Sequence, residues 1–216
     1  MITKINYVTS SDSKIEENEI FQKEGVLGDG TPVRELFEFQ VRSLQIKEIL
    51  EIKIEAMVRE EVTTAYSQLK VPCIVEHAGL IFADCLDKDY PGGLTKPMWD
   101  SLNDQFVSET RSADRPAVAR AVVAYCDGMM VRTFTGERDG RIATSPRGSR
   151  QFYWDTVFIP KDPTNTVSDR TYAEIADDPK LGLEFKVLHL SQSTLAMVKF
   201  LEYIRSAGVP ALWPDR

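Results

Sequence analysis

The stretch from Gly140 to Pro160 constrains the fold most strongly, because a basic loop leads directly into a run of aromatic and apolar residues. The loop half is punctuated by glycine and proline, and it carries Arg141, Arg147 and Arg150. Guanidinium groups pair with phosphate, and glycine lets the backbone come close to a ligand. The loop half therefore predicts contact with an anionic ligand.

The second half of this stretch places Phe152, Tyr153 and Trp154 next to Asp155 and before an apolar run. Aromatic faces stack on nucleic-acid bases with about 1–3 kcal/mol per base. A polar contact at the edge of the base adds selectivity. The pattern predicts a purine pocket, and a core strand with ordinary aromatic packing is the alternative.

The composition fits one soluble, globular domain over residues 1–216, with 43% hydrophobic and 27% charged residues. A net charge of −7 argues against a nucleic-acid polymer as the ligand, since phosphate backbones are met by basic surfaces. A small phosphorylated ligand needs only a local basic pocket. The acidic balance is therefore compatible with a nucleotide.

The cysteine pattern and the hydropathy point to the cytoplasm. Cys73, Cys85 and Cys126 show neither C-x-x-C spacing nor a paired framework, which is typical of reduced thiols. The chain begins without a long apolar segment and contains no run of about 18 apolar residues. We expect no membrane contact.

Near the start, a short strand over 4–9 is followed by Ser10 to Lys14 and then by helical periodicity. Small hydroxyl residues at a helix start leave backbone N–H groups free for an anion, and Lys14 adds positive charge. Ordinary capping of the helix by serine or aspartate is the alternative.

Further elements follow from periodicity and turn residues. We expect strands over 33–41, 73–84, 118–125 and 129–134, and helices over 48–69, 99–106 and 194–207.

Several ordered motifs together resemble the inosine triphosphate pyrophosphatase family, which hydrolyses deaminated purine nucleotides. They are Thr9 to Lys14 for its phosphate loop, Val75 to Leu80 for its V-E-D-[ST]-G-L motif, Pro91 to Lys96, Pro146 to Phe158, and Thr171 to Ile175. The resemblance implies an α/β fold with mixed twisted sheets in two lobes around a central nucleotide cleft. It also implies a homodimer.

The same resemblance implies roles for individual residues. Catalysis would fall to His77 and Glu76, and a metal would be held by Glu48 and Glu76, with Glu51 and Glu55 as nearby alternatives to Glu48. Substrate binding would fall to Thr9, Ser11, Lys14, Lys96, Arg147, Phe152, Trp154, Asp155, Lys186, Gln192 and Ser193.

The departures from the family pattern concentrate in these site residues. His77 stands where the family has a metal-binding aspartate, and Ser11 stands for an asparagine of the phosphate loop. Mg²⁺ prefers oxygen ligands, whereas imidazole suits zinc-like ions, so binding of Mg²⁺ or Mn²⁺ would be weakened. His77 can also act as a base, and a purely structural histidine is the alternative.

The base-recognition segment departs as well. Gln192 stands for the family's histidine and Ser193 for its arginine, and another register would use His189 with Leu190. The arginine is lost in both registers, although Gln192 can donate an amide hydrogen to a carbonyl oxygen.

Residues expected to bind the nucleotide are thus kept, whereas residues expected to hydrolyse it are replaced. This pattern favours a sensor of dITP or ITP with weak or no hydrolytic activity. Antiviral systems of the Kongming type pair a protein similar to this family with a sirtuin-like NADase, so a protein effector partner is expected by analogy. The alternatives are an active pyrophosphatase that releases monophosphate and pyrophosphate, and a structural subunit with a vestigial cleft.

Overall fold

Six strands form one mixed sheet in the order β2-β1-β3-β4-β5-β6. A computed structural model describes residues 2–162 and 164–207, with side chains left undescribed at 150–152. β1 is parallel to β2 and β3, and the remaining neighbours are antiparallel. The strands are β1 Thr3–Val8, β2 Phe37–Arg42, β3 Cys73–Phe82, β4 Pro116–Cys126, β5 Val131–Ile142 and β6 Phe158–Pro160.

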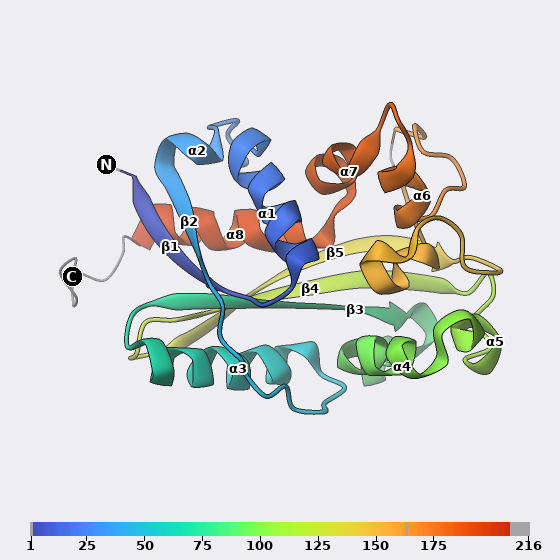
Figure 1. Cartoon of the computed structure of the whole chain (residues 1–216), viewed down its shortest axis with the longest axis horizontal. Coiled ribbons are helices and arrows are strands. Elements are labelled where there is room, and N and C mark those ends of the chain that lie inside the picture. Colours follow the sequence, from blue (N-terminus) through green and yellow to red (C-terminus); the bar gives the residue numbers. More distant parts are fainter. Residues whose placement is uncertain (1, 163, 208–216) are drawn as a thin grey trace.

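Helices cover both faces of this sheet (Figure 1). One face carries α3 Ile54–Leu69, α4 Thr95–Leu102 and α5 Phe106–Glu109. The other carries α1 Asp12–Glu24, α2 Val33–Leu36, α6 Tyr172–Asp177, α7 Gly182–Phe185 and α8 Gln192–Ala207. The short 3₁₀ segments are η1 Ala83–Lys88, η2 Gly92–Leu94, η3 Asn103–Gln105 and η4 Arg150–Thr156, and a π-helical turn is η5 Lys186–Leu190.

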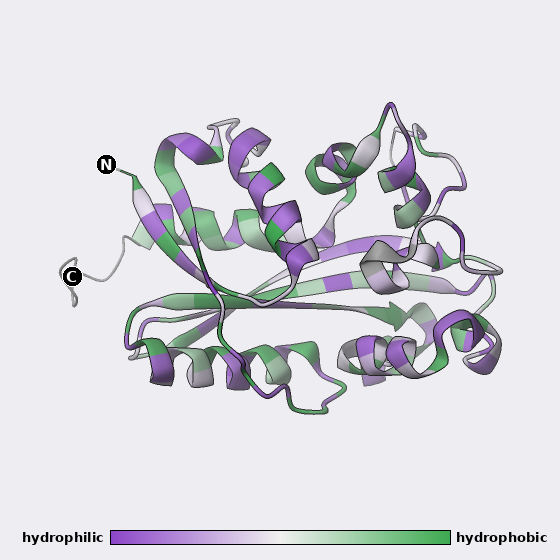
Figure 2. Cartoon of the chain, viewed as in Figure 1, coloured by the Kyte–Doolittle hydropathy of each residue, from purple (hydrophilic) through white to green (hydrophobic). Residues whose placement is uncertain are grey.

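The core lies between the sheet and these helices. Val58, Val62 and Ala65 of α3 pack on the β3–β4 face, and Phe200 and Leu201 of α8 pack on the other face. Figure 2 shows hydrophobic residues along the central strands and a mixture of hydrophobic and polar residues along the covering helices. Burial of this apolar surface supplies the main stabilisation of the fold.

The chain changes sides of the sheet between β1 and β3. α1, which follows β1, covers one face, whereas α3, which precedes β3, covers the other (Figure 1). β1 and β3 are paired only through Asn6 with Cys73 and Tyr7 with Ile74, so the strands part beyond Tyr7. In open α/β sheets, ligands bind in the crevice that such a switch point creates at the carboxyl ends of the strands.

The expected α/β fold with a mixed sheet is confirmed, and its strands belong to one continuous sheet. The helix expected over 99–106 is instead divided among α4, η3 and α5. Two further elements begin later than expected. Residues 33–36 form a helical turn after Pro32 instead of the start of a strand. Residues 48–53 are a loop instead of the first turns of a helix, and the Gly93 amide holds that loop by donating to the Ile52 carbonyl at 2.7 Å.

Among the described residues, no helix has both the length and the apolar character needed to cross a bilayer.

Candidate functional site

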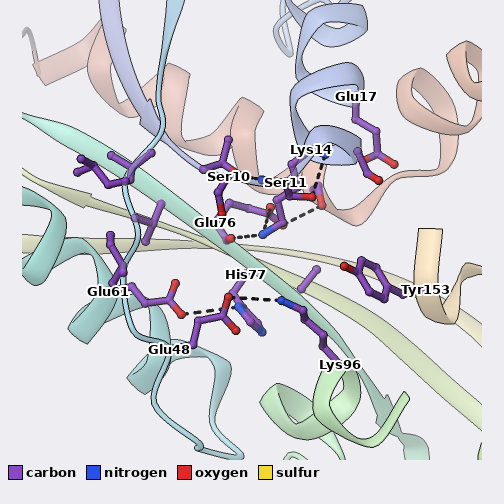
Figure 3. Close-up of a pocket in the computed structure, with 18 of the residues that line it drawn as sticks. Ser10, Ser11, Lys14, Glu17, Glu48, Glu61, Glu76, His77, Lys96 and Tyr153 are labelled. Atoms are coloured by element: carbon purple, nitrogen blue, oxygen red, sulfur yellow. Dashed lines mark hydrogen bonds and ion pairs between the residues drawn. The ribbon is translucent and has the colours of Figure 1, made fainter. Parts of the chain in front are cut away.

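A cavity of about 570 Å³ opens at the carboxyl end of β1 (Figure 3). Its walls come from both faces of the sheet: the end of β1 and the start of α1, residues 44–48, α3, β3, α4, η4, η5 and the start of α8. Of the substrate-binding residues predicted from the sequence, it brings together Thr9, Ser11, Lys14, Lys96, Trp154, Asp155, Lys186, Gln192 and Ser193.

The turn between β1 and α1 forms one wall. The Ser11 hydroxyl accepts a hydrogen bond from the Lys14 amide at 3.4 Å and caps α1, and the Ser11 amide donates to Thr9 Oγ1 at 3.2 Å. Capping therefore describes Ser11 correctly, and the same turn also lines the cavity. The two interpretations of this segment are compatible.

Glu76 lies on the α1 and α8 side of β3 and is fully engaged. Its Oε2 is 3.1 Å from Lys14 Nζ and accepts from the Tyr7 hydroxyl at 3.5 Å, and its Oε1 accepts from the Ser193 hydroxyl at 3.0 Å. Burial would lower the pKa of Lys14, but the Glu76 carboxylate outweighs burial and raises it. Lys14 and Glu76 thus form a charged pair at the cavity wall.

His77 is the next residue of β3, so its side chain points to the opposite face, toward α3 and α4 (Figure 3). Its Nδ1 lies 3.9 Å from Glu61 Oε1. Burial, together with the positive charges of Lys14 and Lys96, lowers the pKa of His77 to about 3. The imidazole is therefore neutral at physiological pH.

Glu61 is a site residue that the sequence interpretation missed. It is only 7% exposed, burial raises its pKa to about 7, and its Oε1 has no hydrogen-bond partner within the described part of the chain. The available signal was its place on the buried stripe of α3, at helical spacing from Met57, Val58 and Ala65. An acid at such a position marks a functional or strained site.

The predicted metal pair of Glu48 and Glu76 needs correction. Donor atoms of Glu48, Glu61 and His77 all lie within 4.8 Å of one another, whereas Glu76 projects from the other face of β3 and pairs with Lys14. The alternation of side chains along a strand separates Glu76 from this group. Glu55, an alternative to Glu48, is occupied by Arg59 at 2.8 Å, and Glu51 accepts from the Lys53 amide at 3.0 Å.

Lys96 and Tyr153 meet at the mouth of the cavity. Lys96 Nζ lies 3.5 Å from Glu48 Oε1 and 5.9 Å from the centre of the Tyr153 ring. Tyr153 is 42% exposed and lines the cavity, and it adopts a φ of +48°. Its ring is thus an accessible aromatic face beside a cation.

A second buried charge cluster lines the cavity near α1. Lys186 Nζ donates to Glu17 Oε1 at 2.7 Å and also to Asp155 Oδ2. Burial would lower the pKa of Lys186, but the Asp155 and Glu17 carboxylates outweigh burial and raise it. Gln192 lies beside this cluster, where its Oε1 accepts from the Tyr172 hydroxyl at 3.1 Å.

Two predicted ligand contacts are placed differently by the structure. Arg147 lies outside the cavity lining, because its Nε donates to Glu174 Oε2 at 3.1 Å and anchors the loop to α6. Arg141 likewise pairs with Asp114, at 2.6 Å, and with Asp169. Arg141 and Arg147 are thus neutralised by acids of the same chain.

The aromatic residues of η4 also differ in their exposure. Trp154 borders the cavity, but it is only 7% exposed and packs edge-on against Phe158, with ring centres 6.1 Å apart. It therefore offers no open stacking face. The side chain of Phe152 lies outside the described residues.

Comparisons of the sequence with known proteins find a family and several relatives. A family model described as the Ham1 family matches residues 5–199. A dITP/XTP pyrophosphatase of Methanopyrus kandleri is 35% identical over 62% of this chain and 66% of its own length. Inosine triphosphate pyrophosphatase 2 of Trypanosoma cruzi is 30% identical over 82% of this chain and 83% of its own.

Solved structures show the same fold. The Staphylococcus aureus Ham1 protein superimposes with a TM-score of 0.65 and 17% identity, covering 95% of this chain and 100% of that one. A HAM1 protein from Coxiella burnetii gives a TM-score of 0.63 and 19% identity over 96% and 100% of the two chains.

Proposed function

The chain belongs to the Ham1 family, and on that premise we propose that its cavity binds a deaminated purine nucleoside triphosphate, dITP or ITP. The observation that carries this proposal is the convergence of Lys14, Lys96 and the Asp155–Lys186 pair on one cavity of about 570 Å³. That volume lies in the range of small-molecule sites. The relatives named as dITP/XTP and inosine triphosphate pyrophosphatases support the choice of nucleotide.

The two kinds of charged group suit the two parts of such a nucleotide. Lys14 and Lys96, with the hydroxyls of Thr9 and Ser11, would contact the phosphates. Lys186 donates hydrogen bonds only, so it favours the carbonyl oxygen at position 6 of hypoxanthine over the amine of adenine. Asp155 would accept from the base, and Tyr153 would supply the aromatic face.

We infer that hydrolysis is weak or absent and that the protein acts as a sensor. A general base that activates water needs an available lone pair and a matched pKa. Glu76 is already bound by Lys14 and Ser193. Burial, together with the charges of Lys14 and Lys96, lowers the pKa of His77 to about 3. A nucleotide bound here would persist, as a receptor requires.

An active pyrophosphatase is the second candidate, in which nucleotide is cleaved to monophosphate and pyrophosphate. The names of the relatives favour it, and so does the meeting of Glu48, Glu61 and His77 in the cavity. Glu61 would then be the base, since its pKa is raised to about 7.

Calorimetric titration with dITP and dATP, followed by chromatography of the recovered nucleotide, separates the candidates. We expect dITP to bind at least about tenfold more tightly than dATP, in line with one lost hydrogen bond, and to be recovered intact. Absence of binding at millimolar dITP would refute the proposal. Release of pyrophosphate over many turnovers would show instead that the protein is an active pyrophosphatase.

We also propose an effector partner and a homodimer, which the family resemblance supports, and a cytoplasmic location, which the cysteine pattern supports. If the sensor acts through a sirtuin-like NADase, dITP should raise the NADase activity of a co-expressed pair, and Lys186→Ala should abolish that rise. Light scattering would distinguish a homodimer from a single chain of 24.4 kDa.

A further inference from the structure

We propose that Glu48, Glu61 and His77 form a binding site for a first-row transition-metal dication of the Zn²⁺ class, in preference to Mg²⁺. The site lies in the cavity to which we assign the nucleotide, so it deepens that proposed function. It can nevertheless be tested without any nucleotide.

The geometry of the three side chains suits a single ion. Each offers a donor atom within 4.8 Å of the others, and His77 Nδ1 is 3.9 Å from Glu61 Oε1. Ligands around one zinc-like ion lie about 3–4 Å from one another, because each is about 2.0–2.2 Å from the metal. A small inward movement of Glu48, which sits on a loop and is half exposed, completes the group.

Glu61 gives an independent reason to place a cation here. It is more than nine-tenths buried, and its Oε1 faces the cavity group without a hydrogen-bond partner in the described residues. A buried carboxylate oxygen without a partner is costly, and a coordinated ion removes that cost. An apolar residue would otherwise fit this stripe of α3 better.

The donor set decides the class of ion. Mg²⁺ requires near-octahedral oxygen ligation and loses water reluctantly, whereas imidazole nitrogen suits zinc, iron and nickel. Three protein ligands, one nitrogen and two carboxylates, also leave open positions for further ligands such as phosphate oxygens. The His77 side chain is therefore the element that selects against Mg²⁺.

The charge balance of the cavity gives such an ion a consequence for the ligand. The described lining residues include four lysines and five carboxylates, so the cavity has no excess positive charge for a triphosphate. A dication reverses this balance. In the structure, Lys96 Nζ lies 3.5 Å from Glu48 Oε1. An ion that binds Glu48 competes with Lys96 and so releases Lys96 to bind phosphate. Metal and nucleotide should therefore bind cooperatively.

The test is calorimetric titration of chelator-treated full-length protein with Zn²⁺, Mn²⁺ and Mg²⁺ in the absence of nucleotide. We expect one Zn²⁺ per chain, bound at least about 100-fold more tightly than Mg²⁺. Substitution with Co²⁺ should give visible absorption bands of nitrogen and oxygen ligation without a thiolate charge-transfer band. Equal affinity for Mg²⁺ and Zn²⁺, or no binding of Zn²⁺, would overturn the inference.

Two isosteric variants locate the site. Glu61→Gln should weaken Zn²⁺ binding at least about tenfold, since one charged ligand is lost, while Glu60→Gln on the exposed side of α3 should leave it unchanged. Glu48→Gln repeats the test on a loop, where the substitution should not disturb folding. Wild-type affinity in both site variants would contradict the assignment, and nucleotide binding could still hold.

Discussion

At the scale of single residues, Tyr153 holds a backbone conformation that favours glycine, with φ of +48°. Glycine adopts this conformation without strain, so the ring of Tyr153 is carried at an energetic cost. A left-handed conformation costs a non-glycine residue about 1–2 kcal/mol. Strain of this kind is retained where it positions a functional group.

This reasoning predicts opposite effects on binding and on stability. Tyr153→Gly should weaken dITP binding about 5–20-fold, because a stacking face is lost, while the free energy of unfolding stays the same or rises slightly as the strain is relieved. Calorimetry and urea unfolding measure the two effects. Tyr153→Phe is the matched control and should bind within about threefold of wild type, since stacking is kept. A glycine variant that binds like wild type would remove Tyr153 from the site.

Glu61 makes stability depend on pH in a way that can be isolated. Its pKa in the folded protein is about 7, against an ordinary value of 4.5, so the folded state binds the extra proton between these values. The cost of ionising Glu61 therefore develops as pH rises from 4.5 to 7 and is complete above 7. His77 acts with the opposite slope, because its lowered pKa makes stability fall as pH drops below 6.5.

Replacing Glu61 with glutamine mimics its protonated form. In the presence of a chelator, Glu61→Gln should stabilise the protein more at pH 8 than at pH 5, by on the order of 2 kcal/mol. Urea unfolding at the two pH values measures the difference. Glu60→Gln should show none, and an equal effect of Glu61→Gln at both pH values would mean that Glu61 is not buried as a perturbed acid.

The sequence predicted the residues that line the cavity well. It predicted less well the hydrogen-bond, ion-pair and packing partners of those residues. Thr9, Ser11 and Lys14 follow directly from a strand that runs into a helix start. The partners of Arg147 could not be predicted, because Glu174 reaches it only through the capping of α6 by Thr171. The burial of Trp154 could not be predicted for the same reason, since its packing on Phe158 is a tertiary contact.

At the scale of elements, strand β3 divides the site. Consecutive residues Glu76 and His77 point to opposite faces, and each gathers a separate group of charged side chains. The long apolar strand itself was predictable from its composition. The loop before α3 was not predictable, because apolar residues such as Ile49 and Ile52 continue the helical period. A tertiary contact, from the Gly93 amide of η2 to the Ile52 carbonyl, holds this loop.

The start of α8 depends on its close approach to β5. A Cβ added at Gly136 would lie 2.1 Å from the Gln192 carbonyl oxygen and 2.5 Å from the Ala196 amide nitrogen. Gly136→Ala should therefore lower the free energy of unfolding by about 1–3 kcal/mol and weaken dITP binding, because the displaced turn carries Gln192 and Ser193. Urea unfolding and calorimetry measure the two effects.

Glu137→Ala is the matched control for this strand, because its side chain is exposed and its ion pair with Arg120, at 2.6 Å, lies at the surface. It should change stability by less than about 1 kcal/mol. If Gly136→Ala behaved like this control, the contact between α8 and β5 would not position the site.

At the scale of the whole molecule, the cavity joins the helices of both faces at the switch point of the sheet. A ligand held there connects α1 and α8 with α3 and α4, so its binding energy should stabilise the whole fold. At 100 times its Kd, dITP should add about 2.7 kcal/mol to the free energy of unfolding. Differential scanning calorimetry should then show a single transition, raised by about 5–10 °C. Two transitions, or no rise at saturating dITP, would contradict this coupling.

The structure of the complex with dITP tests the central claim most directly. The account predicts intact triphosphate in the cavity between β1 and β3, with phosphates near Lys14 and Lys96, position 6 of the base near Lys186, and the ring against Tyr153. A nucleotide bound elsewhere on the molecule, or a cavity that stays filled by its own side chains at saturating dITP, would contradict it.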